Sequence, residues 1–258
     1  MRKRPHSRLS PDRRVADIMA AARAVIAEKG HDKALMADIA ERAGVVEGTL
    51  YRFFENKQDL FAKVAEGWLR EQLDDASGLE GVQGTWNRLR HCVWRSLFIV
   101  RQHPMLSRYV LTEARARADY RSSAFFALNR RFTEEVRDIF REAIRSGEFR
   151  PGVSPALLRD MVFGCIEHRT WAFLRGQADF SVDEVADSIV NVIYRGMAAH
   201  PVEEGAMPAP SPDPGGCPES PSGAATGAQT APKEAVPSAA LHEAIARLER
   251  VATRLELL

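Results

Sequence analysis

The chain has 258 residues, of which 45% are hydrophobic and 28% are charged, so it can form a sizeable core in one large or two small domains. Its formal net charge of +1 excludes a polycation, and any nucleic-acid surface must therefore be local. No apolar run approaches the roughly 18 residues of a membrane span. Cys92, Cys165 and Cys217 lie too far apart in the chain for a disulfide framework or a metal site, which favours a cytoplasmic protein.

The chain begins with a basic arm that is followed by a helix. Residues 1–14 hold six lysines and arginines against a single acid, Asp12, and we expect them to form a flexible arm. From Val15 onward, apolar residues recur at helical spacing. The pair Lys29-Gly30 predicts the end of this helix, because glycine favours the position just after a helix C-terminus.

Two short helices are predicted next, at about residues 36–43 and 46–53. Gly44 lies between them, where the connecting turn needs a positive φ angle. Two short helices joined by such a turn form a helix-turn-helix, and together with the first helix they make residues 15–57 a three-helix DNA-binding domain. In this arrangement the second short helix enters the major groove, with its N-terminal residues nearest the bases.

The second short helix carries residue types that suit contact with a duplex. Gly48 has no side chain, so the backbone and a phosphate group can approach each other closely there. Thr49 and Tyr51 offer hydroxyls to phosphate oxygens, and Lys57 begins the next helix, where free N–H groups also favour an anion. The expected DNA-binding residues are Val46, Glu47, Gly48, Thr49, Tyr51, Arg52, Lys57 and, from the arm, Arg4.

Residues 58–200 are predicted to form a second, larger helical domain. Apolar residues at helical spacing indicate one helix at about 57–75 and another that starts near Trp86 and stops near the pair His103-Pro104. No convincing alternating strand appears, so the predicted fold class is all-α. Further helices are expected at about 105–116, 121–146, 155–175 and 182–198.

The composition changes after His200. Residues 201–238 contain nine of the 14 prolines and few large apolar residues, which predicts a disordered Pro/Gly/Ala linker. Residues 239–258 return to an amphipathic helical pattern. This pattern fits a short coiled coil and fits equally well a helix that docks loosely on a surface.

Residues 18–61 contain, in order, the strings EKG, DIAERAGV, GTLYRFF and K-x-x-L. This combination resembles the DNA-binding domain of the TetR family of bacterial transcriptional regulators. The resemblance implies that the following helical block binds an effector and forms a homodimer through residues 155–198. The chain departs from the family pattern at Leu35 and Val46, where a threonine or serine usually caps a helix, and at Glu47, which is frequently lysine.

A regulator of this kind needs a second site whose occupancy is coupled to DNA binding. The helical block is rich in aromatic residues, and such a bundle suits a small apolar or acyl-type effector. Packing alone is the simpler explanation for any single aromatic residue. The candidate pocket residues are Trp68, Trp94, Phe98, Tyr109, Phe125, Phe163, His168 and Trp171.

The sequence thus predicts a dimeric repressor that binds a palindromic DNA operator and is released by a small effector. An alternative is a DNA-bound interaction module that recruits a protein partner through residues 201–258. No catalytic, metal or cofactor motif appears. The adjacent residues Glu167 and His168 would point about 100° apart on a helix, which is poor geometry for acid–base catalysis, so we expect no enzyme activity.

Overall fold

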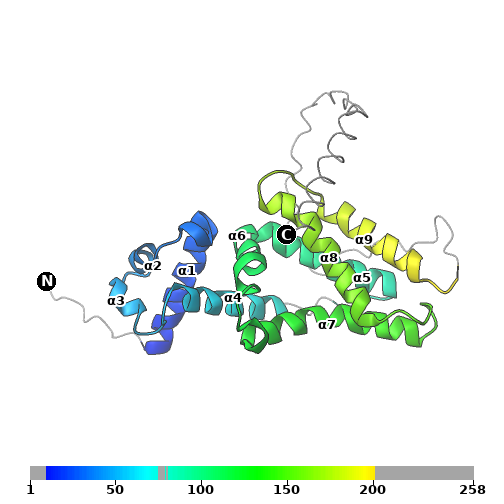
Figure 1. Ribbon diagram of the computed structural model, residues 1–258, viewed down its shortest axis with the longest axis horizontal. Helices are drawn as coiled ribbons and strands as arrows, with labels where there is room; N and C mark the ends of the chain where they lie inside the picture. The colour runs from blue at the N-terminus through cyan, green and yellow to red at the C-terminus, as the bar shows by residue number, and fades with distance from the viewer. Residues whose placement is uncertain (1–9, 75–78, 80, 201–258) are drawn as a thin grey trace, which may run out of the picture. The chain divides into compact units, whose positions relative to one another are not determined.

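The structure is a computed structural model that describes residues 10–74, 79 and 81–200 (Figure 1). The expectations for the arm up to residue 9, for the linker 201–238 and for the helix 239–258 lie outside these residues. The part that is described consists of helices and their connections, with one isolated bridge between Phe149 and Ala198, which confirms the all-α prediction. None of the helices in this part is long and apolar enough to cross a membrane.

The first group of helices comprises α1 (Pro11–Lys33), α2 (Met36–Arg42), α3 (Glu47–Leu50) and α4 (Lys57–Asp74). Helix α1 packs against both α2 and α4, and α2 packs against α3. Their buried side chains form one hydrophobic cluster, which also includes residues of α6 and of the start of α7. The DNA-binding domain, predicted as residues 15–57, therefore shares its core with α4, α6 and the start of α7, which belong to the predicted second domain.

The second group forms its own hydrophobic cluster from α5, α7, α8 and α9. Helix α5 packs against α9, and α7 packs against α8 as well as α4. Phe140 and Phe149 are fully buried in this cluster, with ring centroids 6.1 Å apart. The elements of the second group are α5 (Thr85–Gln102), α6 (Pro104–Tyr109), a π-helical turn (Val110–Ala114), a 3₁₀ turn (Tyr120–Ser122), α7 (Ala124–Arg145), α8 (Pro155–Leu174) and α9 (Val182–Met197).

The first helix begins earlier than the sequence interpretation placed it. The hydroxyl of Ser10 accepts a hydrogen bond from the Arg13 N–H at 3.3 Å, and Pro11 occupies the first turn. Both features are helix-start signals, so residues 11–14 belong to α1 and not to a flexible arm. The helix was predicted to end at Lys29-Gly30. The φ of 76° and ψ of 160° at Gly30 interrupt the helix there, but α1 continues beyond this kink to Lys33.

Two predicted helices are shorter than expected. The helix predicted at 46–53 is α-helical only over Glu47–Leu50, and residues 51–53 continue as turns. The helix predicted at 105–116 is divided into α6 and the π-helical turn Val110–Ala114. A π-helical turn inserts one residue into the helical ladder, and apolar periodicity alone does not reveal such a change.

Replacing Leu35, the apolar N-cap residue of α2, with a capping residue is expected to stabilise the fold. Leu35 provides no side-chain cap and is 59% exposed, while the Asp38 carboxylate accepts a hydrogen bond from the Leu35 N–H at 3.2 Å. The change Leu35→Thr supplies a hydroxyl that completes this capping box, and we expect the free energy of unfolding to rise by about 1 kcal/mol. Urea denaturation measures the gain. The variant Leu35→Ala is the control, and equal stability of both variants would show that no cap forms.

Candidate nucleic-acid interface and ligand cavity

The turn of the helix-turn-helix has the expected backbone geometry. Gly44 has a φ of 65°, which confirms the predicted positive angle. The turn is closed by hydrogen bonds from the Gly44 N–H to the Glu41 carbonyl at 3.1 Å and from the Val45 N–H to the Ala40 carbonyl at 3.0 Å. These bonds fix the angle between α2 and α3.

Helix α3 presents most of the expected DNA-binding residues to solvent. Leu50 is fully buried and anchors the helix, whereas Val46 is 75% exposed and Tyr51 is 51% exposed. The Tyr51 hydroxyl lies 3.4 Å from the Glu47 carboxylate, one turn away. Val46, Glu47, Gly48, Tyr51 and Arg52 are exposed, Thr49 and Lys57 are half-buried, and Arg4 lies outside the described residues.

Lys57 points toward α1 in this structure. Its ammonium group lies 3.5 Å from the carbonyl oxygen of Asp32 and 5.3 Å from the ring centroid of Phe61. The start of α4 is capped by Asn56, whose side-chain oxygen accepts a hydrogen bond from the Asp59 N–H at 2.9 Å. Lys57 therefore has to turn outward before it can contact a phosphate group.

A cavity of about 540 Å³ lies within the second domain. Trp68 and Leu69 contribute to its wall from α4, and these two residues belong to the hydrophobic cluster of the DNA-binding domain. Ile166 contributes from the other cluster. A molecule in this cavity would therefore contact both groups of helices. The apolar lining consists of Trp68, Leu69, Ile99, Val100, Val110, Leu111, Tyr120, Phe125, Phe126, Phe132, Phe163 and Ile166.

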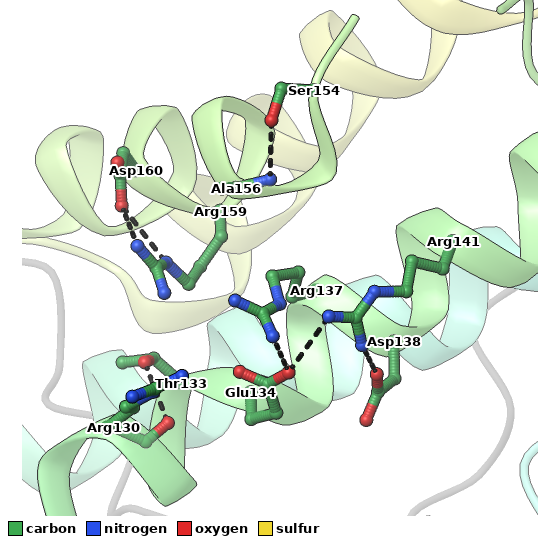
Figure 2. Close-up of polar contacts among 10 residues, drawn as sticks. All are labelled: Arg130, Thr133, Glu134, Arg137, Asp138, Arg141, Ser154, Ala156, Arg159 and Asp160. Carbon is green, nitrogen blue, oxygen red and sulfur yellow. Dashed lines mark hydrogen bonds and ion pairs between the residues drawn. The ribbon is translucent and has the colours of Figure 1, made fainter.

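Arginines from α7 and α8 line the same cavity. Arg130 and Arg137 come from α7, and Arg159 comes from α8. Figure 2 shows the guanidinium groups of Arg137 and Arg159 lying between the two helices. Arg137 pairs with Glu134, and Arg159 pairs with Asp160 on its own helix at 2.6 Å. The cavity wall therefore contains charged groups of both signs, because Asp160 and Glu167 line it as well.

Arg130 is the least neutralised of these arginines. It makes no ion pair with any residue in the described part of the chain, and its side chain is exposed. The Nε atom of Arg137 is buried and has no hydrogen-bond partner there. Both guanidinium groups can still donate hydrogen bonds to an anionic ligand, because a guanidinium group carries five N–H donors.

The structure brings some of the expected pocket residues to the cavity and places others elsewhere. Trp68, Phe125 and Phe163 line the cavity. Trp94 and Phe98 are absent from its lining and stack on each other with ring centroids 4.8 Å apart. These two residues are one turn apart on α5, and their shared face is directed away from the cavity wall formed by Ser96, Ile99 and Val100.

The remaining expected pocket residues also lie outside this cavity. Tyr109 is buried against His31 and Phe61, and burial raises the pKa of its hydroxyl to about 12. His168 is exposed on α8, where it lines a groove beside α9. Trp171 is half-buried beneath the guanidinium of Arg175, which lies 5.2 Å from its ring centroid.

The sequence interpretation missed the polar part of the cavity wall. On α7, Phe126, Arg130, Thr133 and Arg137 follow one another at intervals of three or four residues, and all of them line the cavity together with Asn129. This spacing defines one face of a helix and was readable from the sequence. The predicted pocket residues were aromatic residues and His168, and they include only Phe125 from this helix.

Comparison with known proteins supports the assignment of both domains. Residues 18–64 match the family described as "Bacterial regulatory proteins, tetR family", and residues 83–197 match "Tetracyclin repressor-like, C-terminal domain". The uncharacterized HTH-type transcriptional regulator YvdT of Bacillus subtilis is 26% identical over 182 residues, which cover 70% of this chain and 93% of that protein.

Two solved structures share the fold. The regulator FadR of Bacillus subtilis, in complex with stearoyl-CoA, has a TM-score of 0.59 at 22% identity and covers 70% of this chain and 98% of its own. AibR, in complex with isovaleryl coenzyme A and operator DNA, has a TM-score of 0.55 at 18% identity and covers 70% and 98%. With both domains matched in order, the chain belongs to the TetR family of bacterial transcriptional regulators.

Proposed function

We propose that this TetR-family regulator is a dimeric repressor that leaves a palindromic operator when it binds an acyl-CoA thioester. The observation that carries the proposal is the cavity of about 540 Å³, which combines an aromatic lining with four arginines, Arg115, Arg130, Arg137 and Arg159. An acyl-CoA has an apolar chain and several phosphate groups, so it needs both kinds of surface. As a regulator of DNA, the protein would act in the cytoplasm.

The solved relatives support this effector class. The structure of FadR contains stearoyl-CoA, and the structure of AibR contains isovaleryl coenzyme A. These acyl groups differ greatly in length, so the shared chemistry is the thioester of coenzyme A. In this chain the arginines Arg130, Arg137 and Arg159 would contact the phosphates, and the aromatic lining would enclose the acyl group.

The position of the cavity also explains how a bound ligand would release the protein from DNA. Its lining includes Trp68 of the first hydrophobic cluster and Ile166 of the second. A ligand shifts a conformational equilibrium only when it binds one conformation better than the other. A ligand that contacts both clusters favours the arrangement that fits it, and α4 and α6 transmit the change because both pack against α1.

The exposed face of α3 is the proposed reading surface. Val46 and Glu47 lie at its N-terminus, where they would approach base edges, and Gly48 would allow close contact. A valine side chain suits the methyl group of thymine, and a carboxylate suits the amino group of cytosine. Thr49, Tyr51, Arg52 and Lys57 would contact phosphates, as would Arg4 of the arm.

The faces of α8 and α9 are the proposed dimer interface. Leu157 and Met161 on α8 are 54% and 48% exposed, and Val192 on α9 is 74% exposed. Leu157, Met161 and Cys165 recur every four residues, so they share one face of α8. Apolar side chains gathered on neighbouring helices favour burial against a second copy, and a two-fold dimer suits a palindromic operator.

Arg130 and its neighbour Arg131 provide a matched test of the effector. Both are exposed arginines of α7, but only Arg130 lines the cavity. Arg130→Ala is expected to weaken acyl-CoA binding about ten-fold, because a guanidinium–phosphate contact is lost at a partly solvated site. Arg131→Ala removes the same charge and is expected to leave the affinity unchanged. Isothermal titration with acyl-CoAs of graded chain length measures both.

Free fatty acids provide a second test of the proposed effector. A fatty acid of the same chain length lacks the phosphates, so it should bind more weakly than its thioester to the unaltered protein. Equal binding of the acid and the thioester, or equal losses in the Arg130→Ala and Arg131→Ala variants, would argue against coenzyme A as part of the effector. Failure of every acyl-CoA to bind would remove the proposal altogether.

A further inference from the structure

Besides Arg137, two side chains in the cavity wall carry buried polar atoms without partners among the described residues. Trp68 is 5% exposed and Ser107 is 4% exposed, and both line the cavity. Neither the indole Nε1 of Trp68 nor the hydroxyl of Ser107 has a hydrogen-bond partner among the described residues. Buried polar groups in folded proteins are nearly always paired, so each of these two atoms calls for an explanation.

Several other polar residues of the cavity wall are already satisfied. The hydroxyls of Ser96 and Thr170 donate to backbone carbonyls of their own helices at 2.8 and 2.9 Å. Asn129 donates to the Tyr120 hydroxyl at 3.1 Å, and Arg115 pairs with Glu167. The nearest aromatic partner of Trp68 is the His103 ring, which stands edge-on to it at 5.8 Å and accepts no hydrogen bond from it.

The two unpaired groups lie on a different pair of helices from the arginines. Trp68 is on α4 and Ser107 is on α6, whereas Arg137 and Arg159 are on α7 and α8. Phe125, Phe132 and Phe163 supply the aromatic wall of the same cavity. A ligand whose phosphates bind the arginines would extend its acyl chain along these aromatic side chains toward Trp68 and Ser107.

We propose that Trp68 and Ser107 form an inner polar subsite for an oxygen atom on the acyl chain of the effector. This proposal rests on the proposed function, in which the effector is an acyl-CoA. It specifies the effector as a thioester with a keto group remote from the thioester carbon. The indole N–H is only a donor, so the ligand atom must be an acceptor, and the Ser107 hydroxyl supplies a second donor. A saturated chain would leave both groups unpaired.

The position of the subsite links it to DNA release. Helices α4 and α6 both pack against α1 of the DNA-binding domain. A hydrogen bond from Trp68 and Ser107 to one ligand atom fixes these two helices relative to each other. The oxygenated chain thereby binds one conformation better than the other, which is the requirement for an effector.

A matched pair of ligands tests the subsite on the unaltered full-length protein. The pair consists of a saturated acyl-CoA and the acyl-CoA of equal length with a keto group on its penultimate carbon, compared at six, eight, ten and twelve carbons. The keto compound of the best-fitting length is expected to bind about ten-fold more tightly, as measured by isothermal titration. Equal affinity at every length would overturn the subsite and leave the acyl-CoA function standing.

Variants assign the preference to the two side chains. Trp68→Phe keeps an aromatic ring without the N–H, and combined with Ser107→Ala it is expected to abolish the preference for the keto compound. Trp94→Phe makes the same exchange at a tryptophan outside the cavity and is expected to retain it. A preference that survives in the double variant would overturn the assignment. Failure of all acyl-CoAs to bind the unaltered protein would overturn both the subsite and the proposed function.

Discussion

Replacing Gly48 with leucine is expected to lower operator affinity about a hundred-fold without loss of stability. A Cβ atom at Gly48 meets nothing within 4 Å, so the fold itself accepts a side chain there. Leucine also has a higher helix propensity than glycine, which favours folding by roughly 0.5–1 kcal/mol. The side chain would instead separate α3 from the duplex and remove base and phosphate contacts, each worth about 1–3 kcal/mol.

The Gly48→Leu test is specific because operator affinity is expected to fall while the stability of the fold is expected to rise. Thermal denaturation reports the stability, and fluorescence anisotropy on operator fragments selected from genomic DNA reports the affinity. Ala27→Leu adds a leucine to an exposed position of α1 and controls for a general effect of one more apolar side chain. If Gly48→Leu binds the operator normally, α3 does not lie against the duplex at this residue, and the proposed reading surface is misplaced.

The order of the helices was predictable because the signals are local. Apolar periodicity, the glycine at Gly44 and the pair His103-Pro104 each act within a few residues, and the structure has a positive φ at Gly44 and ends α5 at Gln102. The early start of α1 was also encoded locally, by Ser10 and Pro11, but the density of basic residues around them obscured it.

The wall of the cavity was harder to predict because it depends on how helices cross. Trp68 and Trp94 both lie on apolar faces of amphipathic helices, yet only Trp68 reaches the cavity. The difference arises from the packing of α4 against α7 and of α5 against α9, which are contacts between distant parts of the chain. Residue type and spacing define a face of a helix, but they do not say which partner covers it.

The same limit applies to the proposed interface between two copies. On α9, Glu184, Ser188 and Val192 are exposed and recur every four residues, while Ala186, Val190 and Met197 on the opposite face are buried. The sequence pattern alone shows that α9 is apolar over much of its surface. The structure adds which of its faces the rest of the chain leaves uncovered.

Replacing Val192 with arginine is expected to dissociate the proposed dimer and lower operator affinity about a hundred-fold. Val192 is 74% exposed, so the substitution is expected to change the free energy of unfolding of the isolated subunit little. In a two-fold interface the new charge appears twice and is buried without a partner, at a cost of roughly 3–5 kcal/mol. A dissociated subunit contacts one half-site and loses the contribution of the other. Sedimentation velocity measures the dimer, and anisotropy measures the affinity.

Two further measurements separate dissociation from misfolding. Ala178→Arg adds the same charge to the exposed connection between α8 and α9, and it is expected to remain dimeric. The Val192→Arg subunit should still bind acyl-CoA, because Val192 is not among the residues that line the cavity. A Val192→Arg protein that stays dimeric would place the interface on another surface. Because that interface sets the distance between the two copies of α3, it also sets the spacing of the operator half-sites.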